Sequence, residues 1–218
     1  MKYDLHVHTN RSDGIFEPTA VLDLAKQRGL DCISLTDHDT MVDTDKIIQY
    51  AKQIGIGYLV GVELSCVSSG EVHILGYNID YNAPGFAEEM AKIANMRRER
   101  NRLMVEKLKE FGCEIDLAKL EAQGSVGRGV LAREMVKMGF CQSVTEVFDK
   151  YLGVGCCCYV QTKRLTPVEG IQFILRYGGI PVLAHPKQLK IPFPALVLFV
   201  VILLKAYLTS HSRMSGSR

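Results

Sequence analysis

The sequence lacks a strong charge of either sign, since lysine and arginine outnumber aspartate and glutamate by only 26 to 24 over 218 residues. A net charge of +2 argues against recognition of nucleic acid by bulk electrostatics, so any contact with a nucleotide must be local. Among the seven cysteines, no two have the C-x-x-C spacing, and three are consecutive at positions 156–158. Consecutive thiols are poorly arranged to chelate one ion, so we interpret the cysteines as small buried residues in a reducing cytosol.

Several motifs of common enzyme classes are also missing. The chain contains no glycine-rich phosphate loop, no G-x-S-x-G nucleophile motif and no G-x-G-x-x-G dinucleotide fingerprint. Asp4 and His6 stand where an apolar signal segment would be needed, so we expect a cytoplasmic protein. The length and a hydrophobic content of 47% allow one large domain, or a domain with a sizeable insertion.

Histidine and acidic residues, by contrast, gather in short motifs. Read as a strand, Asp4-Leu5-His6-Val7-His8 has both imidazoles on one face, where they can converge on one metal ion, and Asp13 follows in the next loop. Three more histidines lie in acidic or strand-end contexts: Thr36-Asp37-His38-Asp39, Glu71-Val72-His73 and Ala184-His185-Pro186. A lone histidine is usually a core or surface residue, but five in such positions predict a metal centre. The sixth, His211, lies in a polar tail, and we interpret it as incidental.

Hydrophobic periodicity predicts an α/β fold. Helices are expected over residues 18–28, 44–54 and 167–177, and strands over residues 4–8, 31–36, 58–62, 72–77 and 180–184. Alternating strands and helices predict a mainly parallel sheet, open or closed into a barrel, with the active site at the carboxyl ends of the strands. His73 does not fit this rule, because it lies early in its predicted strand.

From Pro84 to about Thr166 the pattern changes to long helical segments, which predict a helical insertion over the barrel mouth. The first helix has a one-faced stripe at Met90, Ile93, Arg97, Arg100, Met104, Leu108 and Phe111. The two arginines in this stripe have two interpretations: they extend to solvent at the edge of a packed face, or they face the cleft and bind a phosphate. Arg128 is a second candidate anion site, at the glycine-flanked start of a helix with the stripe Leu131, Met135 and Met138.

After Lys190 the sequence changes character. Residues 191–204 carry no charge, but this run is shorter than the roughly 20 residues that span a bilayer, and Pro192 and Pro194 interrupt it. We therefore expect an atypical apolar tail over residues 191–218, and no membrane anchor.

The candidate ligands are imidazoles and carboxylates, a mixed set that suits Zn, Mn or Fe and disfavours Ca or Mg. They outnumber what one tetrahedral ion needs, so we expect two or three divalent ions, with Glu63 as the bridging carboxylate. Clustered ions generate hydroxide near neutral pH and hold the oxygens of an in-line displacement. The sequence thus favours a metal-dependent hydrolase, with a phosphoester as a better substrate than an amide.

These motifs resemble, in their order along the chain, those of the PHP (polymerase and histidinol phosphatase) family. The resemblance rests on His6-Val7-His8, Ser12-Asp13-Gly14, Thr36-Asp37-His38-Asp39, Gly61-Val62-Glu63, His73 and Ala184-His185-Pro186. It implies a distorted (β/α)7 TIM-like barrel, incomplete at the C-terminus, formed by residues 1–83 and 164–190. Residues 84–163 would then form a helical insertion that caps the barrel.

Within the family, the chain is similar to small bacterial phosphoesterases that act on nucleoside 3′,5′-bisphosphates and short 5′-phosphorylated RNA. The similarity includes Arg98-Glu99-Arg100-Asn101-Arg102, Gly127-Arg128 and residues 148–153. The resemblance implies that the metal ligands are His6, His8, Asp13, His38, Glu63, His73 and His185. Asp37, His38 and Glu63 would be the catalytic residues, with Asp37 orienting a histidine. Arg128 and Arg100 would hold the phosphate of a small nucleotide or short RNA, with no extended nucleic-acid surface.

Two departures from the family pattern keep a second hypothesis open. Gly129-Val130 replaces the Pro-His that usually follows the insertion arginine, and no Asp-x-His follows His185 to supply two further ligands. We interpret the change after Lys190 as a truncated or frameshifted terminus. The alternative is therefore a catalytically impaired remnant that binds metal without turnover. An amidohydrolase-type barrel fits less well, because we find neither a bridging lysine at a strand end nor a late catalytic aspartate.

Overall fold

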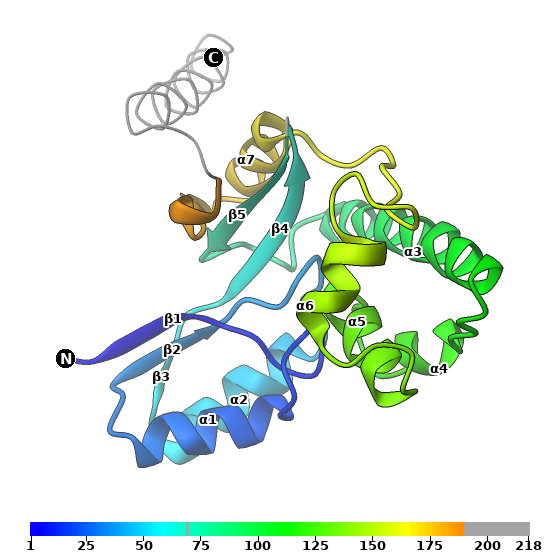
Figure 1. The fold of residues 1–218 in the computed structure, drawn as a ribbon. Coiled ribbons are helices and arrows are strands. Elements are labelled where there is room, and N and C mark those ends of the chain that lie inside the picture. The colour runs from blue at the N-terminus through cyan, green and yellow to red at the C-terminus, as the bar shows by residue number, and fades with distance from the viewer. Residues whose placement is uncertain (69, 190–218) are drawn as a thin grey trace, which may run out of the picture.

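The computed structural model describes residues 1–68 and 70–189, which form a mixed α/β fold (Figure 1). Their strands make two three-stranded sheets, in the orders β1-β2-β3 and β4-β5-β6. In chain order, the elements are β1 (Tyr3–Val7), α1 (Pro18–Gln27), β2 (Cys32–Leu35), α2 (Thr44–Ile54), β3 (Gly57–Tyr58), β4 (Gly61–Val67), β5 (Glu71–Tyr77), α3 (Phe86–Glu110), α4 (Leu117–Glu121), α5 (Arg128–Lys137), α6 (Val144–Val147), the π-helical turn η1 (Phe148–Leu152), α7 (Pro167–Arg176), β6 (Ile180–Leu183) and the 3-10 turn η2 (Pro186–Leu189). The predicted apolar tail, residues 191–218, lies outside the described residues.

The first sheet is parallel throughout, as predicted for this part of the chain. β1 and β3 pair with the two sides of β2, and α1 and α2 lie side by side against the sheet (Figure 1). The predicted stripe of α1 (Val21, Leu22 and Ala25) is buried in one cluster with Ile33 and Leu35 of β2. This packing brings the carboxyl ends of β1 and β2, and the histidine motifs that follow them, to one edge of the sheet.

The second sheet is antiparallel, so the prediction of a mainly parallel sheet is wrong for this half of the strands. The strand predicted over residues 58–62 is divided, because β3 ends beside β2 and β4 begins at Gly61 as a partner of β5. Gly61 lies so close to the side chains of Ser34 and Thr36 that a Cβ atom would overlap them. The chain leaves the first sheet at this crowded glycine, and Glu63 therefore lies within a strand rather than after one.

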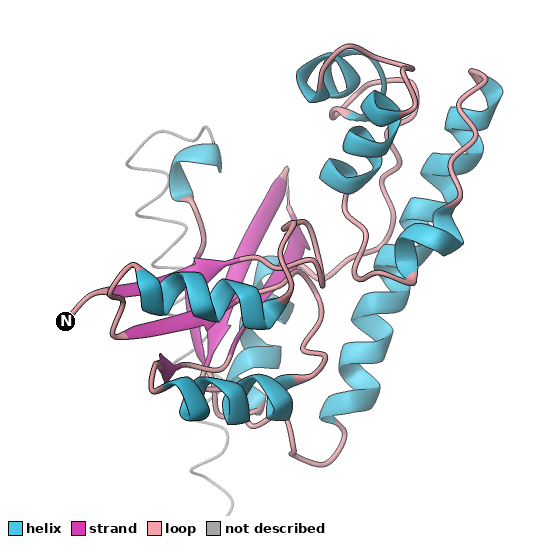
Figure 2. Ribbon diagram, turned by 90° about the horizontal axis from the view of Figure 1, so that it is seen from below, coloured by secondary structure: helices cyan, strands magenta, loops and turns pink. Residues whose placement is uncertain are grey.

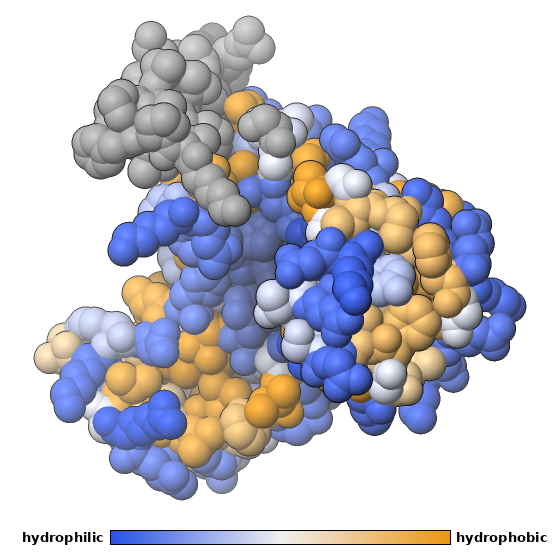
Figure 3. Space-filling view, viewed as in Figure 1, coloured by the Kyte–Doolittle hydropathy of each residue, from blue (hydrophilic) through white to orange (hydrophobic). Residues whose placement is uncertain are grey.

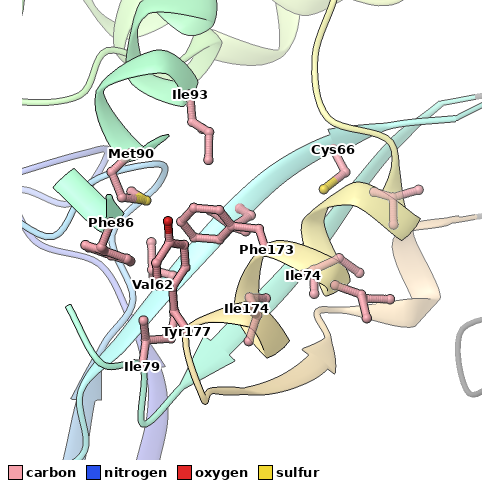
Figure 4. Close-up of a cluster of buried hydrophobic side chains, with 13 residues drawn as sticks. Val62, Cys66, Ile74, Ile79, Phe86, Met90, Ile93, Phe173, Ile174 and Tyr177 are labelled. Atoms are coloured by element: carbon pink, nitrogen blue, oxygen red, sulfur yellow. The ribbon is translucent and has the colours of Figure 1, made fainter. Parts of the chain in front are cut away.

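A buried apolar cluster joins the second sheet to α7 (Figure 4). Val62 of β4 packs in this cluster with Phe173 and Ile174 of α7. Gly170 brings α7 close to β4, because a Cβ atom at this position would lie 2.7 Å from the sulfur of Cys66. The three helices predicted outside the insertion, α1, α2 and α7, all begin at the expected residue.

Helices α3 to α6 lie on one side of the sheets and share an apolar cluster of their own (Figure 2). The predicted stripe of α3 is buried from Met90 to Leu108. Phe111 is 48% exposed, contrary to the prediction, because the helix ends one residue earlier. Met138 is exposed for the same reason, since α5 ends at Lys137.

One isolated parallel bridge, between His38 and Glu63, connects the two sheets. Within residues 1–68 and 70–189 the sheets do not close into a barrel. No helix in this part of the chain is long and apolar enough to cross a membrane. The two halves of the fold therefore meet at two of the predicted metal ligands.

Candidate metal centre

Imidazole groups surround the carboxylate of Glu63, which is only 1% exposed in β4. They are His6 in β1, His8 just after β1, His38 after β2, His73 in β5 and His185 after β6. The face of the molecule shown in Figure 3 is hollowed near its centre, and hydrophilic residues line the hollow. The fold thus gathers all five histidines of the predicted motifs around one carboxylate.

Each oxygen of Glu63 faces its own set of imidazole nitrogens. Oε2 lies 3.1 Å from His8 Nε2, 3.2 Å from His6 Nε2 and 3.4 Å from His38 Nδ1. Oε1 lies 2.9 Å from His185 Nε2 and 3.1 Å from His73 Nδ1. The carboxylate therefore has a bridging position between two sets of donors.

The antiparallel second sheet explains the position of His73. β5 runs opposite to β4, so the early part of β5 lies beside the late part of β4, with His73 opposite Ser65. β6 in turn runs opposite to β5, and the backbone N–H of Ala184 donates to the carbonyl oxygen of His73 at 3.0 Å. An early residue of β5 thus meets His185, which follows the end of β6.

The spacing of the donor atoms fits metal coordination. His6 Nε2 and His8 Nε2 are 3.3 Å apart, and His73 Nδ1 and His185 Nε2 are 3.2 Å apart. Two imidazole nitrogens bound at the usual distance to one tetrahedral ion are separated by about 3.3 Å. Donor atoms converge in two groups of three, His6-Glu63-His185 and His8-His38-Glu63, so His6 lies close to donors beside both oxygens, and His73 is in neither group. The residues present therefore fit divalent metal ions on both sides of the carboxylate.

Burial and neighbouring charges give Glu63 and His38 protonation states that suit metal binding, whereas the carboxylates of Glu63 and Asp13 outweigh burial and raise the pKa of His8. Burial opposes ionisation of Glu63, but hydrogen bonds from His185 and His6 help to hold its pKa far below the usual range. Burial, together with the charge of the Arg97 guanidinium, lowers the pKa of His38 well below its usual value. An ionised carboxylate and a neutral imidazole are the forms that bind a divalent ion.

Asp13 lies at the rim of the centre and is one-third exposed. Its Oδ1 is 3.4 Å from His8 Nδ1, and its Oδ2 is 3.7 Å from His38 Nε2. Both are the ring nitrogens on the side away from Glu63. Arg133 of α5 donates to the backbone carbonyl of Asp13 at 2.7 Å, so the helical segment helps to hold this loop. The structure thus brings Asp13 to the histidines but outside the two converging groups.

Asp37 is buried and acts through the loop that follows β1. It accepts hydrogen bonds from the Thr9 backbone N–H at 2.8 Å, the Thr9 hydroxyl at 2.7 Å and the Ser12 hydroxyl at 2.5 Å. The Ser12 oxygen is in turn 3.4 Å from His8 Nδ1. The expected link from Asp37 to a histidine is therefore indirect, through a hydroxyl whose part in the site the sequence did not reveal.

The arginines in the α3 stripe do not extend to solvent. Arg97 and Arg100 are 6% and 3% exposed, so that interpretation is wrong. Arg97 Nε donates to Asp39 Oδ2 at 2.8 Å, and its Nη2 donates to the Ser65 hydroxyl. The Ser65 oxygen lies 3.5 Å from His38 Nδ1. Arg97 is therefore a paired cation that packs beside the metal centre.

Arg100 and Arg128, the predicted phosphate ligands, both face Glu71 at the start of β5. Arg128 pairs with Glu71 Oε2, and Arg100 Nη1 lies 3.6 Å from Oε1. Sequence reasoning missed Glu71 and also Arg164, whose Nη1 donates to Oε1 at 2.9 Å. The available signal was the i, i+2 spacing of Glu71 and His73, which puts them on one face of the strand.

Comparison with known proteins shows the family of this chain. Residues 4–151 match the model of the PHP domain. The chain is 34% identical over 188 residues to the 5′-3′ exoribonuclease of Haemophilus influenzae, which covers 85% of this chain and 69% of that protein. It is 34% identical over 189 residues to the 3′,5′-nucleoside bisphosphate phosphatase of Chromobacterium violaceum, and this match covers 84% of this chain and 66% of that protein. The chain therefore spans about two thirds of the length of these relatives.

Two solved structures share the fold. An amidohydrolase from Chromobacterium violaceum, with bound sulfate and no metal, has a TM-score of 0.85 at 30% identity, covering 94% of this chain and 74% of that one. A protein from Bifidobacterium adolescentis, assigned as a metal-dependent phosphoesterase, has a TM-score of 0.77 at 27% identity. The match covers 85% of this chain and 67% of that one. With the family model matching more than half of the sequence, the chain belongs to the PHP domain family.

Proposed function

We propose that this chain is a metal-dependent phosphoesterase that hydrolyses nucleoside 3′,5′-bisphosphates or short 5′-phosphorylated RNA. The observation that carries the proposal is the carboxylate of Glu63 among the imidazoles, a mixed donor set suited to Mn, Zn or Fe. The activities named for two relatives, a 5′-3′ exoribonuclease and a 3′,5′-nucleoside bisphosphate phosphatase, support the substrate class. We further propose that the two sheets belong to a distorted barrel that residues 84–163 cap.

The histidines would hold two or three divalent ions together with Glu63, and Asp13 would complete the ligand set. Such ions, when bound, lower the pKa of a water molecule and neutralise the oxygens of a phosphoryl group. Glu63 supplies a full negative charge between the two sets of donors, because its low pKa keeps it ionised. Asp37 and Ser12 fix the orientation of His8, since a ligand whose other ring nitrogen is held binds metal more tightly.

Arg100 and Arg128 would bind a substrate phosphate beside the metal centre. Glu71, which both contact, lies two residues before His73 in β5. Two residues along a strand correspond to about 7 Å, so a substrate with two phosphate groups can reach the histidines and the arginines together. This spacing favours a bisphosphate, or a phosphate next to a phosphodiester, over a monophosphate.

The test is phosphate release from adenosine 3′,5′-bisphosphate by the chain after it has been stripped of metal and then supplied with manganese. We expect release only once the metal is restored. We also expect kcat/KM for adenosine 3′,5′-bisphosphate to exceed kcat/KM for adenosine 5′-monophosphate by about tenfold or more. This is the factor that the free energy of one charge-assisted hydrogen bond to the second phosphate would give. No release with manganese, zinc or iron would contradict the proposal.

A chain that binds metal without turnover is the second candidate, because residues 186–218 contain no Asp-x-His that could add two ligands. Metal content measured beside phosphate release separates the two candidates. Bound metal with release supports the first, and bound metal without release supports the second.

A further inference from the structure

Three guanidinium groups from distant parts of the chain share the carboxylate of Glu71. Arg100 comes from α3, Arg128 begins α5 and Arg164 lies just before α7, and we name these three residues the arginine cluster. Arg164 Nη1 lies 2.9 Å from Glu71 Oε1, and Arg128 pairs with Oε2. Across the described part of the chain, each arginine of the cluster has its ion pair with Glu71 and with no other carboxylate.

The cluster carries more positive charge than Glu71 balances. One carboxylate faces three cations whose side chains are 4%, 13% and 6% exposed at positions 100, 128 and 164. A buried charge without a counter-ion is costly, because water no longer solvates it. Burial and the neighbouring guanidiniums, foremost Arg97, lower the pKa of Arg100 to about 9. A further anion would relieve this excess of positive charge.

Arg100 also has few hydrogen-bond partners. It is 3% exposed, its buried Nε has no hydrogen-bond partner among residues 1–68 and 70–189, and its Nη2 donates to Asn101 Oδ1 at 3.3 Å. A guanidinium offers five N–H donors in a planar fork that matches the oxygens of a phosphate. Arg128, by contrast, is held over the rings of Phe148 and Tyr159, at 5.5 and 5.4 Å from their centroids. The cluster therefore combines a fixed cation with a buried one whose donors are largely unused.

We propose that Glu71 occupies the position of a phosphate in the arginine cluster, that Arg164 is a third phosphate ligand, and that a substrate phosphate displaces the Glu71 carboxylate. Glu71 is the first residue of β5, at the end of the hairpin with β4, and its side chain is 22% exposed, so it has a path toward solvent. A phosphate carries more charge and one more acceptor oxygen than a carboxylate, so it satisfies more of the cluster. The identity of the anion rests on the function proposed above.

The test is a calorimetric titration of inorganic sulfate into the metal-free full chain and its variants. Sulfate has the shape and charge of a phosphate group, and because it is not an ester the chain cannot hydrolyse it during the titration. We expect Arg164→Met to weaken sulfate binding by about tenfold or more, the loss of a charge-assisted hydrogen bond. We expect Glu71→Gln to strengthen sulfate binding by about the same factor, because the competing carboxylate is removed.

The exposed pair of Arg176 and Glu89 supplies matched controls, since Arg176→Met and Glu89→Gln change the charge by the same amounts outside the cluster. Both controls should leave the affinity for sulfate unchanged. Weaker or unchanged binding in Glu71→Gln would overturn the displacement, since Glu71 would then only position the arginines. Unchanged binding in Arg164→Met would remove Arg164 from the phosphate ligands.

Glu71→Gln leaves three arginines without a carboxylate, so its melting temperature is also measured against sulfate concentration. We expect a larger rise with sulfate than in the wild-type chain, and an equal or smaller rise contradicts the displacement. Glu71→Asp keeps the charge but shortens the side chain, so it should bind sulfate between the wild type and Glu71→Gln. Phosphate release from adenosine 3′,5′-bisphosphate is measured separately, so failure of the sulfate test leaves the phosphoesterase proposal standing.

Discussion

Two glutamates on neighbouring strands, Glu63 in β4 and Glu71 in β5, each lie at the centre of a group of nitrogen donors. Around Glu63 the donors are imidazoles, which lose their protons near neutral pH and bind metal. Around Glu71 they are guanidiniums, which keep their protons and bind anions. The same carboxylate group therefore suits two chemistries: one glutamate fits a bridging metal ligand, and the other partly balances the guanidiniums that we propose as a phosphate site.

The two glutamates also differ in how far their side chains are buried. Glu63 is 1% exposed in the middle of its strand, whereas the Glu71 side chain is 22% exposed at the end of a hairpin. Burial opposes ionisation of Glu71, but the charges of Arg128 and Arg164 outweigh it and lower its pKa to about 2. Both carboxylates are thus ionised at neutral pH, and the difference between them lies in their partners and in their exposure to solvent.

The largest effect is expected from Glu63→Gln, which removes the charge shared by both sets of imidazoles. An amide does not bridge metal ions as a carboxylate does, so metal affinity should fall by roughly 100-fold or more and phosphate release should cease. Metal content of the purified chain by mass spectrometry measures the first effect. Glu71→Gln is the matched control and should retain its metal, so equal losses in the two variants would contradict the comparison.

A smaller effect is expected from Arg128→Ala, which alters only the group of arginines around Glu71 (the anion side of the comparison). The loss of a charge-assisted contact should raise KM for adenosine 3′,5′-bisphosphate by about 10- to 100-fold while metal content stays unchanged. His8→Ala should do the reverse, releasing metal and abolishing activity. Loss of metal in Arg128→Ala, or full metal content in His8→Ala, would show that the two groups of donors are wrongly assigned.

Ser12→Ala tests how His8 is oriented on the metal side, the imidazoles around Glu63, because it removes the hydroxyl between Asp37 and His8. Freeing the outer ring nitrogen of a ligand typically costs about 10-fold in metal affinity. Competition with a chelator of known affinity measures this change. A variant with wild-type metal affinity would mean that the Asp37–Ser12 contact serves only the loop.

The smallest effect is expected from Thr166→Ala, which lies outside both groups. Thr166 and Glu169 form a capping box at the start of α7, with the Glu169 N–H donating to the Thr166 hydroxyl at 3.2 Å. Its loss should lower the free energy of unfolding by about 1 kcal/mol in a denaturant titration. Metal content and sulfate affinity should not change, and a change in either would indicate that α7 positions the donors.

The part of the metal side that the first sheet supplies was predictable, because its signals are local. His6 and His8 share one strand face by the period of two, and the pairing of β1 with β2 brings His38 to the same edge. The start of α7 was predictable for the same reason, since Pro167 and the N-cap residue Thr166 are neighbours in the chain. None of these predictions depended on how the second sheet is paired.

The anion side was predictable only in part, because it depends on contacts between distant segments. Arg164 meets Glu71 across 93 positions, and no local pattern marks either residue as a partner of the other. On the metal side, the antiparallel pairing of β4 with β5 follows from the short connection between them, since a few residues can close a hairpin but not a parallel crossover. The strands predicted over residues 58–62 and 72–77 left residues 63–71 unassigned, so the hairpin that places His73 in the site was not predicted.

The most direct test of the role of Glu63 is anomalous scattering at the zinc edge from crystals of the zinc-loaded chain. We predict at least two peaks, one on each side of the carboxylate, each about 2.0–2.2 Å from a Glu63 oxygen and from nitrogens of the imidazoles around it. No peak beside Glu63, or zinc bound only by other residues, would contradict the assignment of this glutamate as the bridge of a metal centre.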